Sequence, residues 1–203
     1  MQASPLMRAG QERSLRPSLR FDSASGTTNA AVFLDIALLY ASEVGADQKL
    51  DVSEQRPSID EQIDALAELH LPLVLIYAIG VASVPDEASK ARAAALARRL
   101  ATRGVRVVAI VPRPSQATRG ASLASVASSL GMAPDECWLI GDQLDDVEIG
   151  NRAGCRSLMI DNGSERDWRG GSFREPLAKL GNLAAAIRVI SAAATSPRYG
   201  WLS

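Results

Sequence analysis

The sequence predicts an α/β protein, a doubly wound three-layer sandwich around a mainly parallel sheet of five or more strands. The first observation is that several short runs are continuously apolar, as in strands that are buried on both faces. The second is that segments with helical periodicity separate these runs. An alternation of buried strands and helices is typical of a parallel sheet with helices on both sides.

The elements of the first half are marked by clear boundaries. Ala30–Asp35 is an apolar run that ends on a carboxylate, which predicts a first strand. Ser58–Leu69 is expected to be a helix because it opens with a serine followed three residues later by a glutamate, the pattern of a capping box. Leu71–Ala78 is the second predicted strand. Pro85–Gly104 is the next helix, with proline in its first turn and glycine at its end.

The second half continues the same alternation. The expected elements are a strand at Val105–Val111, a short helix of small residues at Gly120–Gly131, a strand at Cys137–Asp142, a helix at Leu144–Gly154, a strand at Arg156–Asp161 and a last helix at Leu180–Ala193.

The length and composition favour one domain with a tail. Residues 30–203 suit a single α/β domain, and residues 1–29, which lack hydrophobic periodicity, are expected to form a flexible N-terminal tail. The net charge of −1 argues against a nucleic-acid partner, and no apolar run reaches the roughly 18 residues that a membrane span needs. We therefore expect a cytoplasmic protein without a membrane partner. Cys137 and Cys155 are expected to be buried thiols, and with His70 as the one histidine no zinc site is expected.

Acidic residues follow the first and fourth predicted strands. In open parallel sheets, ligands bind at the carboxyl ends of the strands, where Asp35 and Asp142 are expected. If these strands are neighbours, two carboxylates face each other, and Mg²⁺ is the usual cation that relieves such repulsion. Asp146 is four residues beyond Asp142 on the same helical face and is expected to support the site from behind. The alternative is that these acids only cap helices.

The stretch "IGDQLDDVEIGNRAG" resembles the fourth motif of the haloacid dehalogenase-like (HAD) superfamily. The matching residues are Gly141, Asp142, Asp146, Gly150, Ala153 and Gly154. "AVFLD", which ends at Asp35, resembles the first motif. The layout from Ala31 to Ile190 is similar to the heptose-bisphosphate and histidinol-phosphate phosphatase branch, and the short distance from Asp35 to Tyr77 leaves no room for a large cap domain.

This resemblance implies roles for individual residues. Asp35 would be the nucleophile that forms an aspartyl-phosphate. Mg²⁺ would be held by Asp35, by Asp142 and by the backbone carbonyl of Ala37, with Asp146 behind them. The lysine of the third motif, which balances the charge of aspartate and phosphate, aligns best with Arg119.

The same resemblance also shows where the motifs are degenerate. The first motif of the family is Asp-x-Asp-Gly-Thr, whereas this chain has Asp35-Ile36-Ala37-Leu38-Leu39. Ala37 cannot act as the general acid, a loss that typically costs on the order of 10²–10⁴-fold in rate. Tyr77 stands in place of the phosphate-binding Thr or Ser of the second motif, and the zinc-binding loop of the branch is replaced by "PRPSQAT".

Two functional hypotheses follow. The first is a HAD-like protein that descends from a Mg²⁺-dependent sugar-phosphate phosphatase, with weak or no catalysis and a role as a binding or partner subunit. The second is an active phosphate monoester hydrolase that acts on a small sugar phosphate through Asp35. The expected partner is a small phosphorylated metabolite or a protein.

Overall fold

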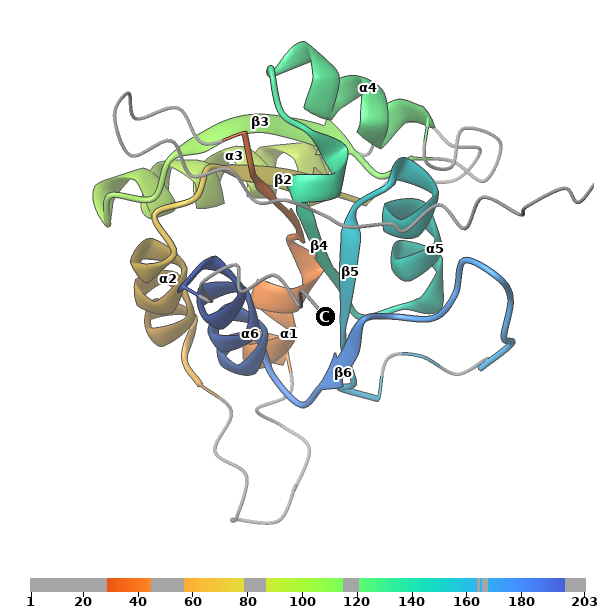
Figure 1. Ribbon diagram of the computed structural model, residues 1–203. Coiled ribbons are helices and arrows are strands. Elements are labelled where there is room, and N and C mark those ends of the chain that lie inside the picture. Colours follow the sequence, from red (N-terminus) through yellow and green to blue (C-terminus); the bar gives the residue numbers. More distant parts are fainter. Residues whose placement is uncertain are drawn as a thin grey trace, which may run out of the picture.

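The computed structural model describes residues 29–44, 57–78, 87–114, 121–163, 165 and 168–195, and its core is a six-stranded parallel sheet (Figure 1). Its order is β3-β2-β1-β4-β5-β6, and every neighbouring pair is parallel. The strands are β1 (Val32–Asp35), β2 (Leu73–Tyr77), β3 (Val107–Pro112), β4 (Trp138–Gly141), β5 (Arg156–Ile160) and β6 (Ala178–Leu180). The predicted α/β class and parallel sheet are confirmed.

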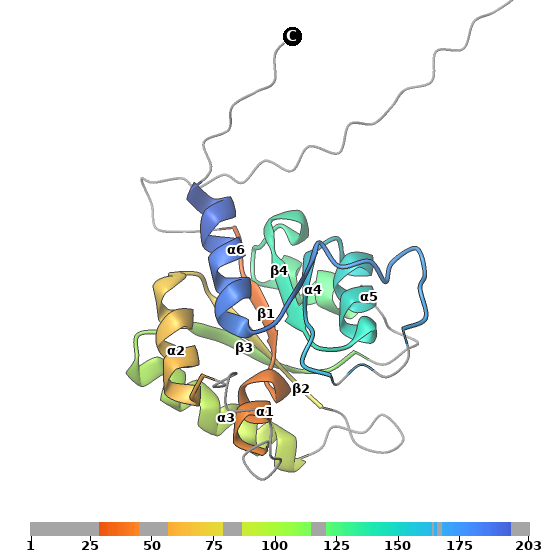
Figure 2. The same cartoon turned by 90° about the horizontal axis from the view of Figure 1, so that it is seen from below.

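Helices cover both faces of this sheet, which makes three layers (Figures 1 and 2). The helices are α1 (Ala37–Val44), α2 (Ile59–Glu68), α3 (Glu87–Thr102), α4 (Ala121–Ser129), α5 (Leu144–Ala153) and α6 (Leu183–Thr195), with a 3₁₀ turn, η4, at Pro134–Glu136. One apolar cluster joins the sheet to α1, α2, α3 and α6, and a second joins the opposite face to α4 and α5.

The local signals in the sequence set the ends of several helices. Ser58 caps α2, because the N–H of Glu61 donates to Ser58 Oγ at 3.3 Å and the N–H of Ser58 donates to Glu61 Oε2 at 2.7 Å. Gly154 ends α5 in the left-handed conformation, with a φ of 86° that favours glycine.

The helix α1, the strand β6 and the 3₁₀ turn η4 were not predicted from the sequence. The helix α1 begins two residues after Asp35, and its Leu38 and Leu39 are buried in the first apolar cluster. The strand β6 has three residues, of which none is fully buried. A run that short carries no periodicity by which it could be recognised. The strand ends at Leu180, so the last helix, expected from Leu180, begins instead at Leu183 as α6.

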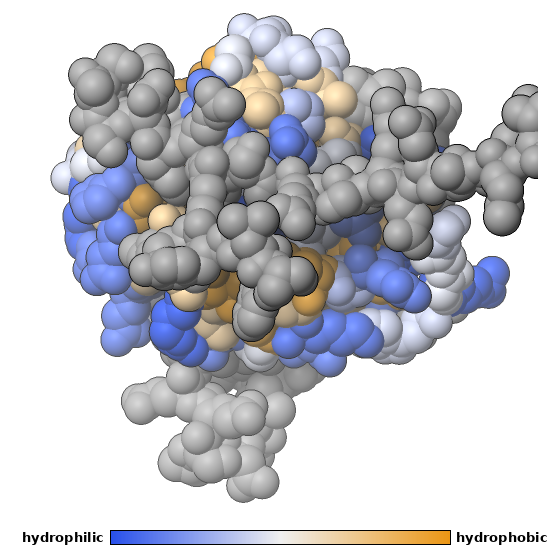
Figure 3. Space-filling view, in the orientation of Figure 1, coloured by the Kyte–Doolittle hydropathy of each residue, from blue (hydrophilic) through white to orange (hydrophobic). Residues whose placement is uncertain are grey.

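The surface at the left of Figure 3, beside α2, is largely hydrophilic. There Asp60 of α2 pairs with Arg99 of α3 at 3.0 Å, and Arg103 just after α3 contacts both Asp60 and Asp64. These ion pairs are exposed and are therefore expected to contribute little to stability.

Other expectations fall partly outside the described residues. Of the expected tail, only Asn29 is described, and its carbonyl accepts a hydrogen bond from the N–H of Ala133 at 2.9 Å. Cys137 and Cys155 are buried free thiols, as expected, and burial raises their pKa to about 11 and about 12. Among the described residues, no helix combines the length and the apolar character that a bilayer crossing demands.

Candidate functional site

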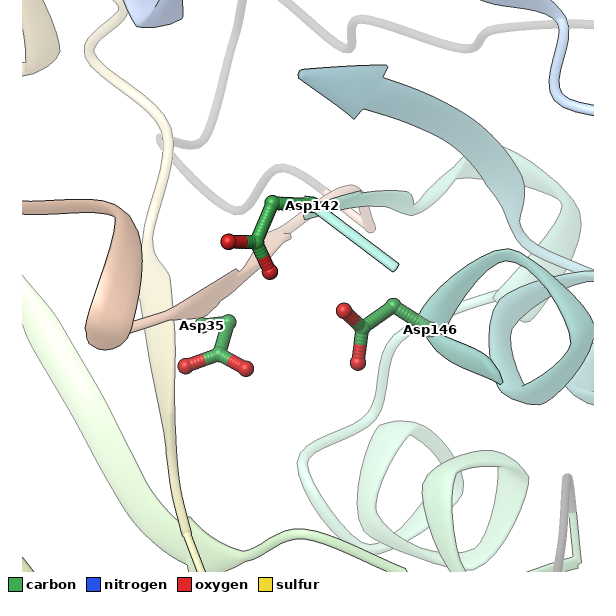
Figure 4. Close-up of side chains that lie close together, drawn as sticks. All are labelled: Asp35, Asp142 and Asp146. Atoms are coloured by element: carbon green, nitrogen blue, oxygen red, sulfur yellow. The ribbon is translucent and has the colours of Figure 1, made fainter. Parts of the chain in front are cut away.

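Three carboxylates meet at the carboxyl edge of the sheet (Figure 4). Strands β1 and β4 are neighbours, with Leu34 opposite Ile140, so that Asp35 and Asp142 emerge side by side. Asp146, from the first turn of α5, faces the same point. One oxygen of each of the three carboxylates lies within 4.8 Å of the others, and all three residues are buried. The predicted convergence of Asp35 and Asp142 is confirmed.

Both oxygens of Asp35 already accept hydrogen bonds. The N–H of Ala37 donates to Oδ1 at 2.8 Å, and Nη2 of Arg113 donates to Oδ2 at 2.5 Å. Burial raises the pKa of Asp35, and the charge of Asp142 acts in the same direction, whereas the guanidinium of Arg113 opposes the rise. The first contact is what helix capping predicts. The second brings a cation from a distant strand and is not explained by capping.

Asp146 belongs to the acidic cluster itself. Its Oδ1 accepts from Nη2 of Arg113 at 2.5 Å, and its Oδ2 accepts from the N–H of Gln143 at 3.2 Å. Burial raises the pKa of Asp146 to about 7, with help from the charges of Asp35 and Asp142 and against the effect of Arg113.

The glycine of the fourth motif makes room for this aspartate. A Cβ on Gly141 would lie 2.3 Å from the Cβ of Asp146, which is closer than two carbon atoms that are not bonded to each other can approach. The Cβ of Asp146 is fixed to the backbone of α5, so it cannot turn away. A glycine at position 141 therefore lets the end of β4 lie close to the first turn of α5, and this contact places Asp146 in the cluster.

Asp142 is held differently from the other two acids. Its Oδ2 accepts a hydrogen bond from Nδ2 of Asn162 at 3.1 Å. Asn162 lies just after β5, the strand next to β4. Within the described part of the chain, Arg113 makes no hydrogen bond or ion pair with Asp142. The hydrogen-bond donor to Asp142 is thus a neutral amide, whereas Asp35 and Asp146 contact a guanidinium.

Among the residues that the structure describes, the cation that contacts the acidic cluster is Arg113, which was not predicted from the sequence. It follows β3, and its Nη1 donates to Oε1 of Gln143 at 3.1 Å. Its buried Nε has no hydrogen-bond partner within the described residues. Burial disfavours the charged form of Arg113 and so acts to lower its pKa. The negative charges of Asp146 and Asp35 outweigh this effect and hold the pKa of Arg113 above its ordinary value. Arg119, the cation expected from the third motif, lies outside the described residues.

One signal in the sequence could have identified Arg113. The rule that ligands bind at strand ends applies equally to the end of the third predicted strand, Val105–Val111, and Arg113 follows that strand by two residues. The sequence did not show that β3 lies two strands away from β1 on the side opposite β4.

Of the residues that replace the other motif positions, three face the core and Ala37 does not. Leu38, Leu39 and Tyr77 all belong to the apolar cluster that joins the sheet to α1, α2, α3 and α6. Ala37 is exposed at the first position of α1. The N–H of Leu39 donates to the carbonyl of Ile36 at 3.1 Å, and that of Ala37 donates to Asp35.

The donor set fits a hard divalent cation. Three carboxylates and one guanidinium carry a net charge of −2 when all are ionised, which one divalent cation would neutralise. Carboxylate oxygens are the ligands that Mg²⁺ prefers, and all three residues of the cluster are aspartates. The role of the Ala37 carbonyl as a further ligand stays a prediction.

Comparisons with known proteins show what this chain is similar to in sequence and in fold. A family model described as HAD-hydrolase-like matches residues 114–181. The fold is similar to D,D-heptose 1,7-bisphosphate phosphatase from B. bronchiseptica, whose crystal structure contains magnesium and phosphate. That similarity has a TM-score of 0.57 at 19% identity and covers 80% of this chain and 99% of that one.

Two further solved structures have a similar fold. One is an uncharacterized protein from Listeria monocytogenes serotype 4b, with a TM-score of 0.51 at 14% identity over 80% of this chain and 98% of that one. The other is a predicted phosphoglycolate phosphatase from Haemophilus somnus, with a TM-score of 0.50 at 15% identity over 74% of this chain; the match spans 61% of that protein's length. A search of curated protein sequences gives no match. The family model bears out the resemblance to the HAD superfamily over residues 114–181, and the similar structures show the fold.

Proposed function

We propose that this HAD-like chain keeps the acidic centre of a Mg²⁺-dependent sugar-phosphate phosphatase as a binding site, and that it hydrolyses phosphate esters weakly or not at all. The observation that carries the proposal is the hydrogen bonding of Asp35, together with the missing general acid two residues after it. Its two oxygens accept from Ala37 and Arg113, and the position that would supply the general acid is an alanine.

The loss of the general acid supports weak turnover. Phosphoryl transfer depends on positioning and on stabilisation of charge, including protonation of the leaving oxygen. The methyl group of Ala37 cannot transfer a proton, and the first turn of α1 places hydrophobic Leu38 and Leu39 after it. The alcohol portion of a phosphate ester bound here would have to depart as an alkoxide, because the alanine at position 37 cannot give it a proton.

The backbone of this turn also offers few donors for a phosphate group. The N–H groups of Ala37 and Leu39 both donate within the chain, to Asp35 Oδ1 and to the carbonyl of Ile36. Tyr77, which replaces a phosphate-binding hydroxyl residue in the resemblance, is packed in the apolar core and is 5% exposed. These three residues therefore offer no free group that would orient a phosphate for attack, because their donors are in use or buried.

The acidic cluster supports retained binding. Asp35, Asp142 and the carbonyl of Ala37 would hold Mg²⁺, whose charge would attract a phosphorylated molecule. Arg113 would provide a second positive charge beside it. We propose a small phosphorylated metabolite as the ligand, in a cytoplasmic protein; a protein partner is the second candidate for a chain that no longer turns over.

An active phosphate monoester hydrolase is the alternative function. The observation that favours it is that Arg113 supplies the charge balance expected of the third motif, so that the cluster has its acids and its cation. Under this alternative, Asp35 would attack phosphorus slowly, without help from a proton donor.

The experiment is Mg²⁺-dependent phosphate release from a panel of sugar phosphates, with the wild type and Asp35→Asn. We expect no difference between the two proteins above the background rate, together with saturable binding of Mg²⁺ by the wild type. Turnover that Asp35→Asn abolishes would establish the alternative. Asp64→Asn, which removes an exposed carboxylate of α2, is the matched control for the change itself.

A further inference from the structure

Within the described residues, Asp142 is the one acid of the cluster to which Arg113 donates no hydrogen bond, although the charge of Asp142 still acts on Arg113. Arg113 donates to Asp35 and to Asp146 at 2.5 Å, and each of these acids also accepts from a backbone N–H. Asp142, within the described residues, accepts one hydrogen bond, from Nδ2 of Asn162. The conformation of this carboxylate therefore depends on a single side chain.

That dependence has an electrostatic reason. Three buried carboxylates whose oxygens lie within 4.8 Å of one another repel, and rotation about χ1 would take Asp142 away from its two neighbours. The donor on Asn162 opposes this rotation because it fixes one oxygen of Asp142 at 3.1 Å. The other oxygen then remains available to the cluster.

The chemical nature of the donor is also significant. A lysine or arginine at position 162 would neutralise Asp142, as Arg113 partly neutralises its two partners. An amide orients the carboxylate and leaves its charge in place. Asn162 also precedes Gly163, which has a φ of 81°, so a tight turn directly after β5 sets the position of the amide beside the end of β4.

We infer that Asn162 is the positioning residue of the divalent-cation site, acting through Asp142. The inference rests on the proposal that the acidic centre binds a cation. It does not depend on whether phosphate esters are hydrolysed. Hydrogen-bond partners of metal-binding carboxylates typically change metal affinity by 10–100-fold when they are removed.

The test is the affinity for Mn²⁺, measured by titration calorimetry and by the electron paramagnetic resonance signal of the free ion, on the full chain without any substrate. We expect Asn162→Ala to weaken Mn²⁺ binding by about 10–100-fold. Asn162→Leu, which keeps the volume but has no donor, is expected to behave in the same way. Asn162→Gln, which restores an amide donor, is expected to recover part of the affinity.

Asn151→Ala is the matched control for a purely structural effect. Nδ2 of Asn151 donates to the carbonyls of Phe173 and Glu175 at 2.9 Å, and so it ties a loop to α5. We expect this variant to lower the melting temperature while Mn²⁺ affinity stays at the wild-type value. The inference is overturned if Asn162→Ala binds Mn²⁺ as tightly as the wild type, or if the wild type binds no Mn²⁺. High phosphatase activity with the expected Mn²⁺ result would overturn the proposed function alone.

Discussion

The guanidinium of Arg113 lies 2.5 Å from the carboxylate of Asp35, although the two residues are 78 positions apart in the chain. The same nitrogen contacts Asp146 at 2.5 Å. One side chain therefore joins the ends of β1 and β3 and the start of α5. This contact sets the charge balance of the acidic centre, and four predictions follow from it and from the packing around it.

Replacing Arg113 with methionine is expected to destabilise the protein at pH 8 in the absence of divalent cations. The change leaves three buried carboxylates without a cation, and loss of one partner of a buried ion pair typically costs about 3–5 kcal/mol. The measurement is urea unfolding with EDTA present. Saturating Mg²⁺ should recover part of the loss, because a ligand that binds only the folded state stabilises it.

The control for this change is Arg103→Met. Arg103 also pairs with two aspartates, Asp60 and Asp64, but on the exposed surface of α2 and α3. We expect nearly unchanged stability, since exposed ion pairs are screened by water. Equal losses in the two variants would show that the buried position of Arg113 has no special importance.

The stability of the metal-free protein is expected to fall as the pH rises from about 4 to about 7. Burial raises the pKa of Asp146 from its ordinary value of 3.8 to about 7, so between these values the folded state binds more protons than the unfolded state. Raising the pH therefore favours unfolding, and the effect ends above the folded pKa. Asp35, whose pKa is also raised, contributes in the same direction.

This pH dependence is measured as the difference in unfolding free energy between the wild type and Asp146→Asn, from urea titrations with EDTA at several pH values. The wild type should lose stability relative to the variant as the pH rises. A difference that is constant with pH, or that grows in favour of the wild type, would contradict the prediction.

Gly141→Ala is expected to weaken Mn²⁺ binding and to lower stability. The new Cβ would lie 2.3 Å from the Cβ of Asp146, so α5 has to shift away from β4 and takes its acid with it. Calorimetry and urea unfolding measure the two effects. Gly170→Ala is the control because nothing lies within 4 Å of its new Cβ. Unchanged Mn²⁺ affinity in Gly141→Ala would show that the position of Asp146 does not matter to the site.

Restoring the acid alone is not expected to restore catalysis. In Ala37→Asp, the new carboxyl group can donate a proton, but Leu38 and Leu39 remain in the core and Asp35 remains bonded to Arg113. We expect less than a tenfold rise in phosphate release, against the 10²–10⁴-fold that a general acid typically provides in a competent site. A rise of that full size would mean that the proton donor was all the site lacked.

Local features of the site were predictable from the sequence because they are encoded in consecutive residues. Asp35 and Asp142 follow continuously apolar strands, and ligands in such sheets bind at strand ends, which places both acids at one edge. Asp146 follows Asp142 by one helical turn. The mainly parallel sheet and its helices follow in the same way from the period of the apolar residues.

Arg113 and Asn162 could not be assigned in this way. Arg113 reaches Asp35 and Asp146 from the end of β3, which is two strands away from β1 in the sheet. Asn162 reaches Asp142 because β5, which it follows, is the neighbour of β4. Strand order is a property of packing between helices and sheet. No short stretch of sequence near either residue records it.

The amino-acid sequence by itself determined the layered α/β class, the start of α2, the end of α5 and the presence of acids at the ends of β1 and β4, because capping, periodicity and strand ends act over a few residues. The tertiary structure decided which cation neutralises those acids, which amide orients Asp142 and whether the leucines after Asp35 face a ligand or the core. These properties arise from the order of the strands and the burial of side chains, which bring distant residues within hydrogen-bond distance.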